Sequence, residues 1–435
     1  MKLKFILFFL LVSCQKKNQF INVTINLPSY NQSKYEISFQ NINNDDFFIT
    51  YWDEEDNKLN SDSKNKSNEY IVIPFLKPST NYFFRINSKK NISKLYTFKT
   101  HDLPENFPEF NLNKDSLFSF SGYLLFRTQM DPGIQFLMDD EGKIIWYSMS
   151  DSAFSRPFNI SNEFSYISLS KKNIIHELSY NGDTLLTLNM VDDEIHHEIT
   201  TSSNVYDSSK VYIGLTYEYL LNPNSEVDSI IGDGISVYNN SGIKIWSWNI
   251  FDHVNPYNEK YKIQNDWSHA NGVEVDNDGN FLISFRNFSQ IWKIDSRSGK
   301  ILWRLGIDGD YFLKENEIFY SQHAIHKNNT NNYMLFDNGA RDYRETSRAL
   351  VFSLNEKNSV FNYVRSVYLP NDLFTFKQGS VYNIDDEKYL FCSSTNNRIV
   401  ILNSSGKILW DLDSDHSFYR VYYINKNNLF FNQKN

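Results

Sequence analysis

Hydrophobic and polar residues alternate over short stretches along most of this chain, a pattern that predicts β-strands joined by turns. From about residue 113 onward one unit recurs: a hydrophobic run, a turn with Gly or Asn, and a second run that often ends at Trp. The recurring segments are FLMDDEGKIIWY, ELSYNGDTLLTL, SVYNNSGIKIWSW, WKIDSRSGKILWR, FSLNEKNSVFNYV and VILNSSGKILWDL. Each is typical of a β-hairpin, so we expect six hairpins of one kind.

The spacing of these hairpins predicts their assembly. Their turns lie at Gly142, Gly182, Gly242, Gly299, Lys357 and Gly406. Neighbouring turns are 40 to 60 residues apart, which suits the four-stranded blade of a propeller, whereas a right-handed solenoid would need shorter repeats. We therefore expect a six-bladed β-propeller over residues 113–435, with these hairpins toward its outside.

Residues 20–101 predict a separate, small β-sandwich. The segment IVIPFLKPSTNYFFRINS resembles the E–F corner of fibronectin type III domains, in which the hydroxyl of Tyr82 would close a tyrosine corner. Residues 102–112, with two prolines, are expected to form a linker. The expected fold class is all-β: a six-bladed propeller preceded by a small, fibronectin III-like sandwich.

The N-terminus, MKLKFILFFLLVSCQKK, combines lysines with an apolar run that is too short to span a bilayer but suits a signal peptide. The sequence LVSC resembles a bacterial lipobox. It predicts a signal peptide over residues 1–13, lipidation of Cys14, a tether over residues 14–19 and a membrane-anchored lipoprotein in the bacterial cell envelope, facing the periplasm. The alternative is an ordinary signal peptide whose cysteine is incidental.

Composition agrees with this picture and narrows the partners. Aromatic residues make up 16% of the chain, which favours strands, and the formal net charge is -9. No basic run is long enough to follow a phosphate backbone, so we expect no nucleic-acid partner. Once Cys14 carries lipid, Cys392 has no cysteine to pair with, and its apolar strand predicts a buried small hydrophobe.

Three histidines occupy equivalent places in successive repeats. His197, His269 and His323 each follow an outer hairpin and stand near the start of an expected inner strand, the strand that lines a propeller's channel. Arg286 ends the strand after His269, so its hairpin returns it toward the same mouth. We expect the four side chains to converge, and such a cluster implies an anionic ligand.

Each of these residues, taken alone, can also be an ordinary polar side chain that is hydrogen-bonded in the channel and has no functional role. A zinc site of His197, His269 and His323 is the sharper rival, but the charge of Arg286 argues against a cation, so we expect no metal and no cofactor. Strand alternation predicts that His196 and His326 face away. Gln322 and Asp266 are expected to support the site, and a solvated loop is expected for Arg341, Tyr343 and Arg348.

The chain lacks a GxxxxGK[ST] loop and a GxSxG elbow, which argues against nucleotide-phosphate and serine-hydrolase chemistry. A sulfuryl group carries less charge than a phosphoryl group, so Arg and imidazole can suffice without metal. A histidine nucleophile would divide the transfer into two displacements.

Several motifs together resemble the bacterial arylsulfate sulfotransferases: HHEI, WSWNIFDHVNPYN, DWSHANGVEVD, ISFRNFSQIWKID, ILWRLG, QHAIH, FDNGARDYRETSRALVFSL and YRVYYI. The resemblance implies a PAPS-independent, ping-pong transfer of sulfuryl from a phenolic sulfate ester to a phenol. His323 matches the histidine that becomes sulfated. His269 and Arg286 match the groups that hold the sulfuryl oxygens, and His197 matches the fourth member of the site.

Two alternatives stay open beside this resemblance: a lipid-anchored propeller that binds an anionic ligand without catalysis, and a sulfate-ester hydrolase. The identities of donor and acceptor are not predicted, and a homodimer is left open. The resemblance itself does not imply the lipid anchor or the fibronectin-like character of the sandwich.

Overall fold

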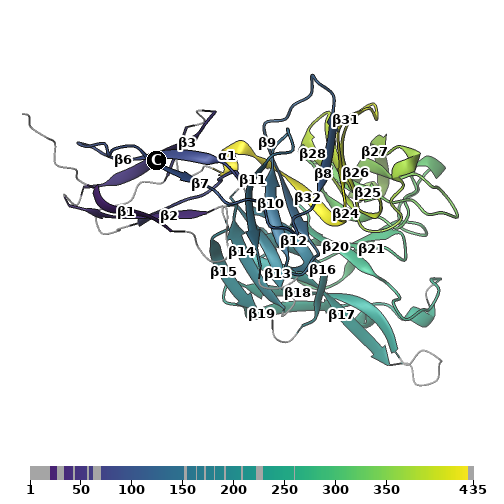
Figure 1. Ribbon diagram of the computed structural model, residues 1–435. Coiled ribbons are helices and arrows are strands. Elements are labelled where there is room, and N and C mark those ends of the chain that lie inside the picture. The colour runs from purple at the N-terminus through teal and green to yellow at the C-terminus, as the bar shows by residue number, and fades with distance from the viewer. Residues whose placement is uncertain are drawn as a thin grey trace, which may run out of the picture.

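The computed structural model describes residues 20–26, 34–42, 45–55, 58–61, 70–150, 154–162, 164–170, 173–180, 182–190, 193–206, 209–221, 229–258 and 260–429. Figure 1 shows the first strands, in purple, set to one side of a larger ring of sheets that runs from blue to yellow. Cys14 and the predicted signal peptide lie outside the described residues. Among the residues described, no helix has the length and apolar character needed to cross a membrane.

The N-terminal unit is a sandwich of two antiparallel sheets. One sheet has the order β1 (Phe20–Asn26), β2 (Tyr35–Asn41), β5 (Tyr70–Ile73), and the other has the order β4 (Leu59–Asn60), β3 (Phe47–Asp53), β6 (Asn81–Ser88), β7 (Tyr96–Lys99). Alternate residues of β2, β3 and β6 are buried, as expected where one face of each sheet meets the other. The Tyr82 hydroxyl accepts a hydrogen bond of 2.9 Å from the Lys77 backbone N–H, which is the contact of a tyrosine corner.

The remaining strands form six antiparallel sheets, the blades of a propeller. From the inner strand outward, the first blade is β32 (Phe418–Asn425), β9 (Gly122–Thr128), β10 (Ile134–Met138), β11 (Ile144–Met149), and the second is β12 (Phe154–Asn162), β13 (Ser165–Ser170), β14 (Ile174–Ser179), β15 (Thr184–Asn189). The third blade is β16 (Ile195–Ser202), β17 (Val211–Leu221), β18 (Ser229–Asn239), β19 (Lys244–Asn249), and the fourth is β20 (Ala270–Val275), β21 (Phe281–Phe285), β22 (Gln290–Ile294), β23 (Ile301–Gly306). The fifth blade is β24 (His323–Lys327), β25 (Tyr333–Asp337), β26 (Arg348–Asn355), β27 (Val360–Tyr368), and the sixth is β28 (Ser380–Asp385), β29 (Lys388–Ser393), β30 (Arg398–Asn403), β31 (Ile408–Ser414), β8 (Phe110–Lys114). This arrangement confirms the predicted all-β fold.

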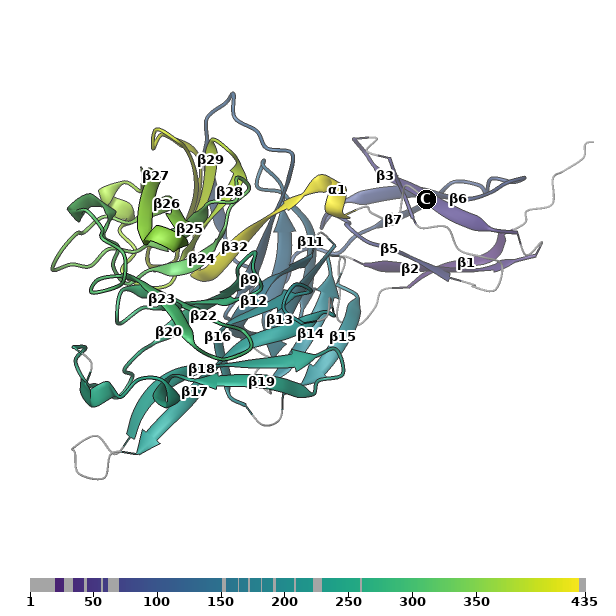
Figure 2. The ribbon, with the colours of Figure 1, turned by 180° about the vertical axis from the view of Figure 1, so that it is seen from behind.

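Helices are short and lie between or after the strands. They are η1 (Ile250–Asp252), η2 (Pro256–Asn258), η3 (Glu315–Glu317), η4 (Glu356–Asn358), η5 (Asn371–Leu373), η6 (Ser394–Asn396) and α1 (Lys426–Leu429). Figure 2 shows α1 and the yellow strand β32 leading from the propeller toward the sandwich.

The repeated hairpins are where the sequence predicted them, between the third and the fourth strand of each blade, counted from the channel. Five of their turns contain a glycine with a positive φ, between 74° for Gly299 and 84° for Gly182. That backbone conformation is inexpensive only for glycine, which explains why glycine recurs there. In the fifth blade the turn is η4, which contains Lys357.

Strands from both ends of the propeller segment close the ring. The inner strand of the first blade is β32, so the C-terminal strand completes a sheet begun by β9–β11. On the outside of the sixth blade, β8 pairs with β31. Residues 110–112, expected to be linker, therefore belong to a blade. The first and second blades meet where the Tyr422 hydroxyl donates to the carbonyl of Phe158 at 3.1 Å.

Candidate active site at the starts of the inner strands

The inner strands are irregular at the ends where the histidines lie. The pairing register shifts after His196 in β16, after Ala270 in β20 and after His323 in β24. His197 and His269 have left-handed backbones, with φ of 49° and 47°. A bulge adds a residue to one strand of a pair and redirects side chains, and bulges are common beside active sites. Here they turn several polar side chains toward one mouth of the channel.

His197, His269 and Arg286 lie together at this mouth. The ring centroids of His197 and His269 are 4.9 Å apart. The backbone N–H of Arg286 donates to the carbonyl of His269 at 3.1 Å, so the hairpin does return Arg286 beside His269. The carboxylate of Asp266 accepts a hydrogen bond from Nδ1 of His269, which fixes the ring and leaves its Nε2 directed elsewhere.

His323 is buried, with 2% of its surface exposed. Its Nδ1 lies 2.7 Å from Oδ1 of Asn338. The Asn338 amide nitrogen donates to the carbonyls of Thr375 at 2.7 Å and Gln378 at 2.8 Å, which identifies the atom facing His323 as an oxygen acceptor. Nδ1 of His323 must then carry the proton, and Nε2 keeps its lone pair.

Electrostatics keep His323 neutral. Burial lowers its pKa to about 3 because the imidazolium loses hydration; the hydrogen bond to Asn338 opposes this, and the positive charges of Arg286 and Arg420 add to it. The pKa of His197 is also lowered well below its usual value, first by burial and then by neighbouring His196 and His269. These two rings are therefore neutral, polar groups near neutral pH.

The positive charge of the site belongs to two arginines. Arg286 donates to Oδ1 of Asn287 at 3.1 Å and to the carbonyl of Phe376 at 3.4 Å, and Arg156 lies 3.5 Å from Nε2 of His197. None of the described carboxylates forms an ion pair with either guanidinium. Burial lowers the pKa of Arg286, but an arginine remains charged. Two cations without a carboxylate partner favour an anionic ligand.

The expectation that His196 faces away from His197 is wrong. Their Nδ1 atoms are 2.8 Å apart, Nε2 of His196 is 3.2 Å from Asp233, and the His196 ring stacks on Tyr217. Strand alternation fails here because the bulge begins between the two residues. The contacts place Asp233 beside His196, His196 against His197, and His197 beside Arg156.

Two residues of this site were not predicted from the sequence. Arg156 follows the Gly142 hairpin at nearly the distance at which His197 follows Gly182, so the spacing that picked out the histidines also marks it. Asn338 follows β25 as Arg286 follows β21, at the end of the second strand of its blade. Its motif, FDNG, belongs to the segments that resemble the family, but the resemblance implies no particular role for Asn338.

The other candidates have structural roles or lie at the surface. The buried Gln322 amide donates to the Ser284 hydroxyl at 3.0 Å and to the Gln290 carbonyl at 2.9 Å, which ties β24 to the preceding blade. Arg348 is buried and pairs with Asp337, contrary to the expected solvated loop. Arg341 and Tyr343 are exposed, as expected.

His326 points into the channel farther along β24 rather than to an opposite, purely structural face. It lines a cavity past the cluster described above. Cys392 is buried, as predicted. Among the residues described, no group of three or more His, Cys, Asp and Glu side chains is arranged to hold a metal ion.

Comparison with known proteins places these features in a family. The model of the arylsulfotransferase (ASST) family matches residues 109–399. A search of curated proteins gives no match. Similar solved structures include a protein of unknown function from Bacteroides caccae, with 11% identity and a TM-score of 0.46 over 70% of this chain and 100% of that chain. A catalytically inactive virginiamycin B lyase from Staphylococcus aureus, with quinupristin, has 12% identity and a TM-score of 0.32 over 92% of this chain and 96% of that chain.

Proposed function

Because the chain belongs to the arylsulfotransferase (ASST) family, we propose that it moves a sulfuryl group from a phenolic sulfate ester to a phenol, without PAPS and through a sulfohistidine at His323. Membership of the family supports arylsulfotransferase activity on small phenolic substrates. One observation carries the finer proposal: His323 is buried and neutral, and Asn338 occupies its Nδ1, which leaves Nε2 with a lone pair for attack.

In the first half-reaction the sulfate ester binds with its sulfuryl oxygens toward Arg286 and Arg156. Nε2 of His323 attacks sulfur, an N–S bond forms, and the bond from sulfur to the aryl oxygen breaks with its electron pair on the phenolate. The phenolate takes a proton from a neighbouring imidazolium and leaves as a phenol. Asn338 accepts a hydrogen bond from Nδ1 and stabilises the positive charge that develops on the ring.

His269 is the better proton donor of the two neighbouring histidines. Asp266 on its Nδ1 stabilises an imidazolium and directs Nε2 toward the site. His197 is disfavoured in that role because burial and nearby positive groups oppose its protonation. We assign His197 the task of positioning Arg156, because its Nε2 can accept a hydrogen bond from that guanidinium and so hold it toward a sulfuryl oxygen.

The second half-reaction reverses these steps with another phenol. The acceptor gives its proton to neutral His269, its oxygen attacks sulfur, and the N–S bond breaks to restore His323. The proton and the sulfuryl group are balanced over the cycle, which predicts ping-pong kinetics. Water in place of the acceptor phenol would make the same site a sulfate-ester hydrolase.

The test uses purified protein, 4-nitrophenyl sulfate and phenol, without added metal or PAPS. We expect phenol-dependent release of nitrophenolate, formation of phenyl sulfate and a sulfuryl-sized gain in intact mass. His323→Ala should lose both the mass gain and turnover, Arg286→Ala should lose on the order of 10²-fold in rate, and the surface variant His416→Ala should be unchanged. Near wild-type turnover by His323→Ala would disprove the covalent route, and nitrophenolate release without phenyl sulfate would identify a hydrolase.

We further propose that the chain is a lipoprotein of the bacterial cell envelope, anchored through Cys14, with a fibronectin III-like sandwich between the membrane and the propeller. The lipobox and the short apolar run support the anchor. The two-sheet order and the hydrogen bond between Tyr82 and Lys77 support the fibronectin-like assignment. In a bacterial host, Cys14→Ser should move the protein from the membrane fraction to the soluble fraction.

A further inference from the structure

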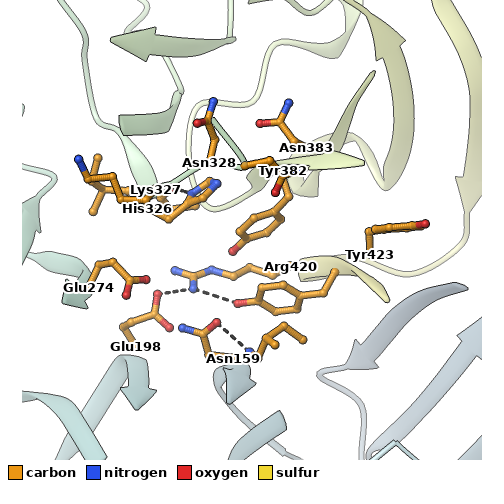
Figure 3. Close-up of a pocket in the computed structure, with 15 residues that line it drawn as sticks. Asn159, Glu198, Glu274, His326, Lys327, Asn328, Tyr382, Asn383, Arg420 and Tyr423 are labelled. Carbon is orange, nitrogen blue, oxygen red and sulfur yellow. Dashed lines mark hydrogen bonds and ion pairs between the residues drawn. The ribbon is translucent and has the colours of Figure 1, made fainter. Parts of the chain in front are cut away.

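A cavity lies along the propeller axis, past the cluster of histidines and arginines. Its volume is about 370 Å³. Residues from all six inner strands line it: Asn159, Ile160, Glu198, Glu274, Ala324, Ile325, His326, Lys327, Tyr382, Asn383, Arg420, Tyr422 and Tyr423. Figure 3 shows Glu198 and Glu274 on one side, His326 and Tyr382 on another, and Arg420 between them. Because β24 begins with His323 and its following residues line this cavity, the two sites are distinct but adjacent along one channel.

Two carboxylates, Glu198 and Glu274, line the cavity, and within the described part of the chain only Glu198 forms an ion pair. Glu198 forms an ion pair with the buried Arg420, whose guanidinium also donates to the Asn271 carbonyl at 3.3 Å. Glu274 accepts only from the Val275 backbone at 3.0 Å, and no basic side chain among the described residues pairs with it. Lys327 instead lies 3.6 Å from Asp276. A positively charged ligand would therefore balance the unpaired carboxylate of this cavity.

A buried oxygen points to the same need. Oε1 of Glu198 has no hydrogen-bond partner, although only 3% of that residue is exposed. An unpaired carboxylate oxygen in a buried position is costly unless a donor reaches it. Two further buried atoms of the lining lack a hydrogen-bond partner within the described ranges: Nε of Arg420, a donor that water or a ligand oxygen would satisfy, and Oδ1 of Asn383, an acceptor.

Aromatic rings form the wall opposite the carboxylates. The Tyr382 ring lies 4.8 Å from His326 and 4.7 Å from Tyr422. Nδ1 of His326 is 2.8 Å from the Ala324 carbonyl, and burial lowers the pKa of His326 to about 4, so this ring adds no positive charge near neutral pH. Ring faces attract ammonium groups, and carboxylates bind them, so the two walls favour the same ligand.

We propose that this axial cavity binds a small protonated amine, whose ammonium group lies between Glu274 and the unpartnered oxygen of Glu198 and faces the ring of Tyr382. An anion is disfavoured because it would meet the unpaired Glu274. Burial raises the pKa of Glu198 and of Glu274 to about 7, and the positive charge of Arg420 opposes the rise at both carboxyl groups. The site uses no residue assigned to sulfuryl transfer.

The test is isothermal titration calorimetry of the purified protein with 2-phenylethylamine at neutral pH, beside 2-phenylethanol as its neutral isostere. Neither compound is a phenol, so neither is an acceptor for the proposed reaction. We expect saturable binding of the amine alone, at least tenfold weaker in Glu274→Gln, unchanged in the exposed control Glu345→Gln, and unchanged in His323→Ala. Tyr382→Leu should also weaken binding, which provides a second variant if Glu274→Gln folds poorly.

Three outcomes would overturn the inference: no saturable binding of the amine up to about 10 mM, equal binding of amine and alcohol, or full affinity in both Glu274→Gln and Tyr382→Leu. Loss of amine binding in His323→Ala with retention in Glu274→Gln would assign the amine to the other mouth and would equally reject the cavity. Because the titration measures no turnover, its result is independent of whether the protein transfers sulfuryl groups.

Discussion

At the residue scale, the chemistry depends on which nitrogen of His323 is free. Asn338 decides this, because its amide nitrogen is held by two carbonyls and only its oxygen can face the ring. Without that acceptor the ring can rotate or change tautomer, and Nε2 is no longer fixed for attack.

Asn338→Ala should therefore slow sulfuryl transfer by about tenfold to a hundredfold, with little change in the KM for the donor. Steady-state kinetics with 4-nitrophenyl sulfate measure the effects on kcat and on KM separately, and intact mass measures how much sulfohistidine accumulates. Ser347→Ala, at a buried hydroxyl that contacts the Asn338 carbonyl but not His323, is the matched control for general disturbance of the loop. A rise in KM with an unchanged kcat would show that Asn338 positions substrate instead.

A second residue-scale prediction concerns acid stability. Burial lowers the pKa of His326 to about 4, whereas an unfolded histidine has a pKa of about 6.5. Below pH 6.5 the unfolded chain binds a proton that the folded chain does not, so the free energy of unfolding is highest above that pH and falls as pH drops toward 4. His326→Gln should flatten this fall by up to about 1.4 kcal/mol per pH unit. Urea unfolding at pH 7.5, 6 and 5 measures the free energy of unfolding of the wild type and of His326→Gln. The same dependence of this free energy on pH in both proteins would contradict the prediction.

At the element scale, the ring closes through strands far apart in the sequence. The C-terminal strand β32 pairs with β9, and its buried Arg420 reaches Glu198 of β16. Truncation after Asp415 should therefore leave the first blade without its inner strand and unfold the propeller, whereas truncation after Asn425 keeps β32 intact. Circular dichroism and thermal melting compare the two; a cooperative melt of the shorter chain would show that the ring holds without β32.

How far the sequence predicted these elements follows from how local each signal is. The outer hairpins were predictable because a glycine turn between two hydrophobic runs is encoded within about a dozen residues. The pairing of β8 with β31 and of β32 with β9 has no such local signal, and residues 110–112 were assigned to a linker for that reason. The strand bulges have no local signal either. Spacing alone predicts His323, His269, Arg286 and His197 as site residues, and strand alternation puts His196 on the wrong face.

At the scale of the whole molecule, the sandwich packs directly against the propeller. Phe75, which follows β5, is buried in one cluster with Leu125, Ile145 and Trp146 of the first blade. Phe107, in the segment between the two units, packs against the Phe136 ring at a centroid distance of 4.9 Å. Ion pairs of Lys34 with Asp183 and of Lys143 with Glu55 also join the two units, so apolar and charged contacts together dock the sandwich on the propeller.

Phe75→Ala should uncouple the two units, because it removes a large buried side chain from their contact, at a cost of about 3 kcal/mol. Calorimetry should then resolve a separate, lower transition for the sandwich, while Trp52→Ala, which removes a partly buried ring stacked on Phe83 on the outer face of one sheet, lowers only that unit's own stability. Since the proposed active site is built from the first and second strands of the propeller blades and the loops beside them, sulfuryl transfer by Phe75→Ala should match the wild-type rate below its first transition. A loss of turnover there would mean that docking of the sandwich shapes the channel, and the sandwich would then be part of the catalytic unit rather than its tether.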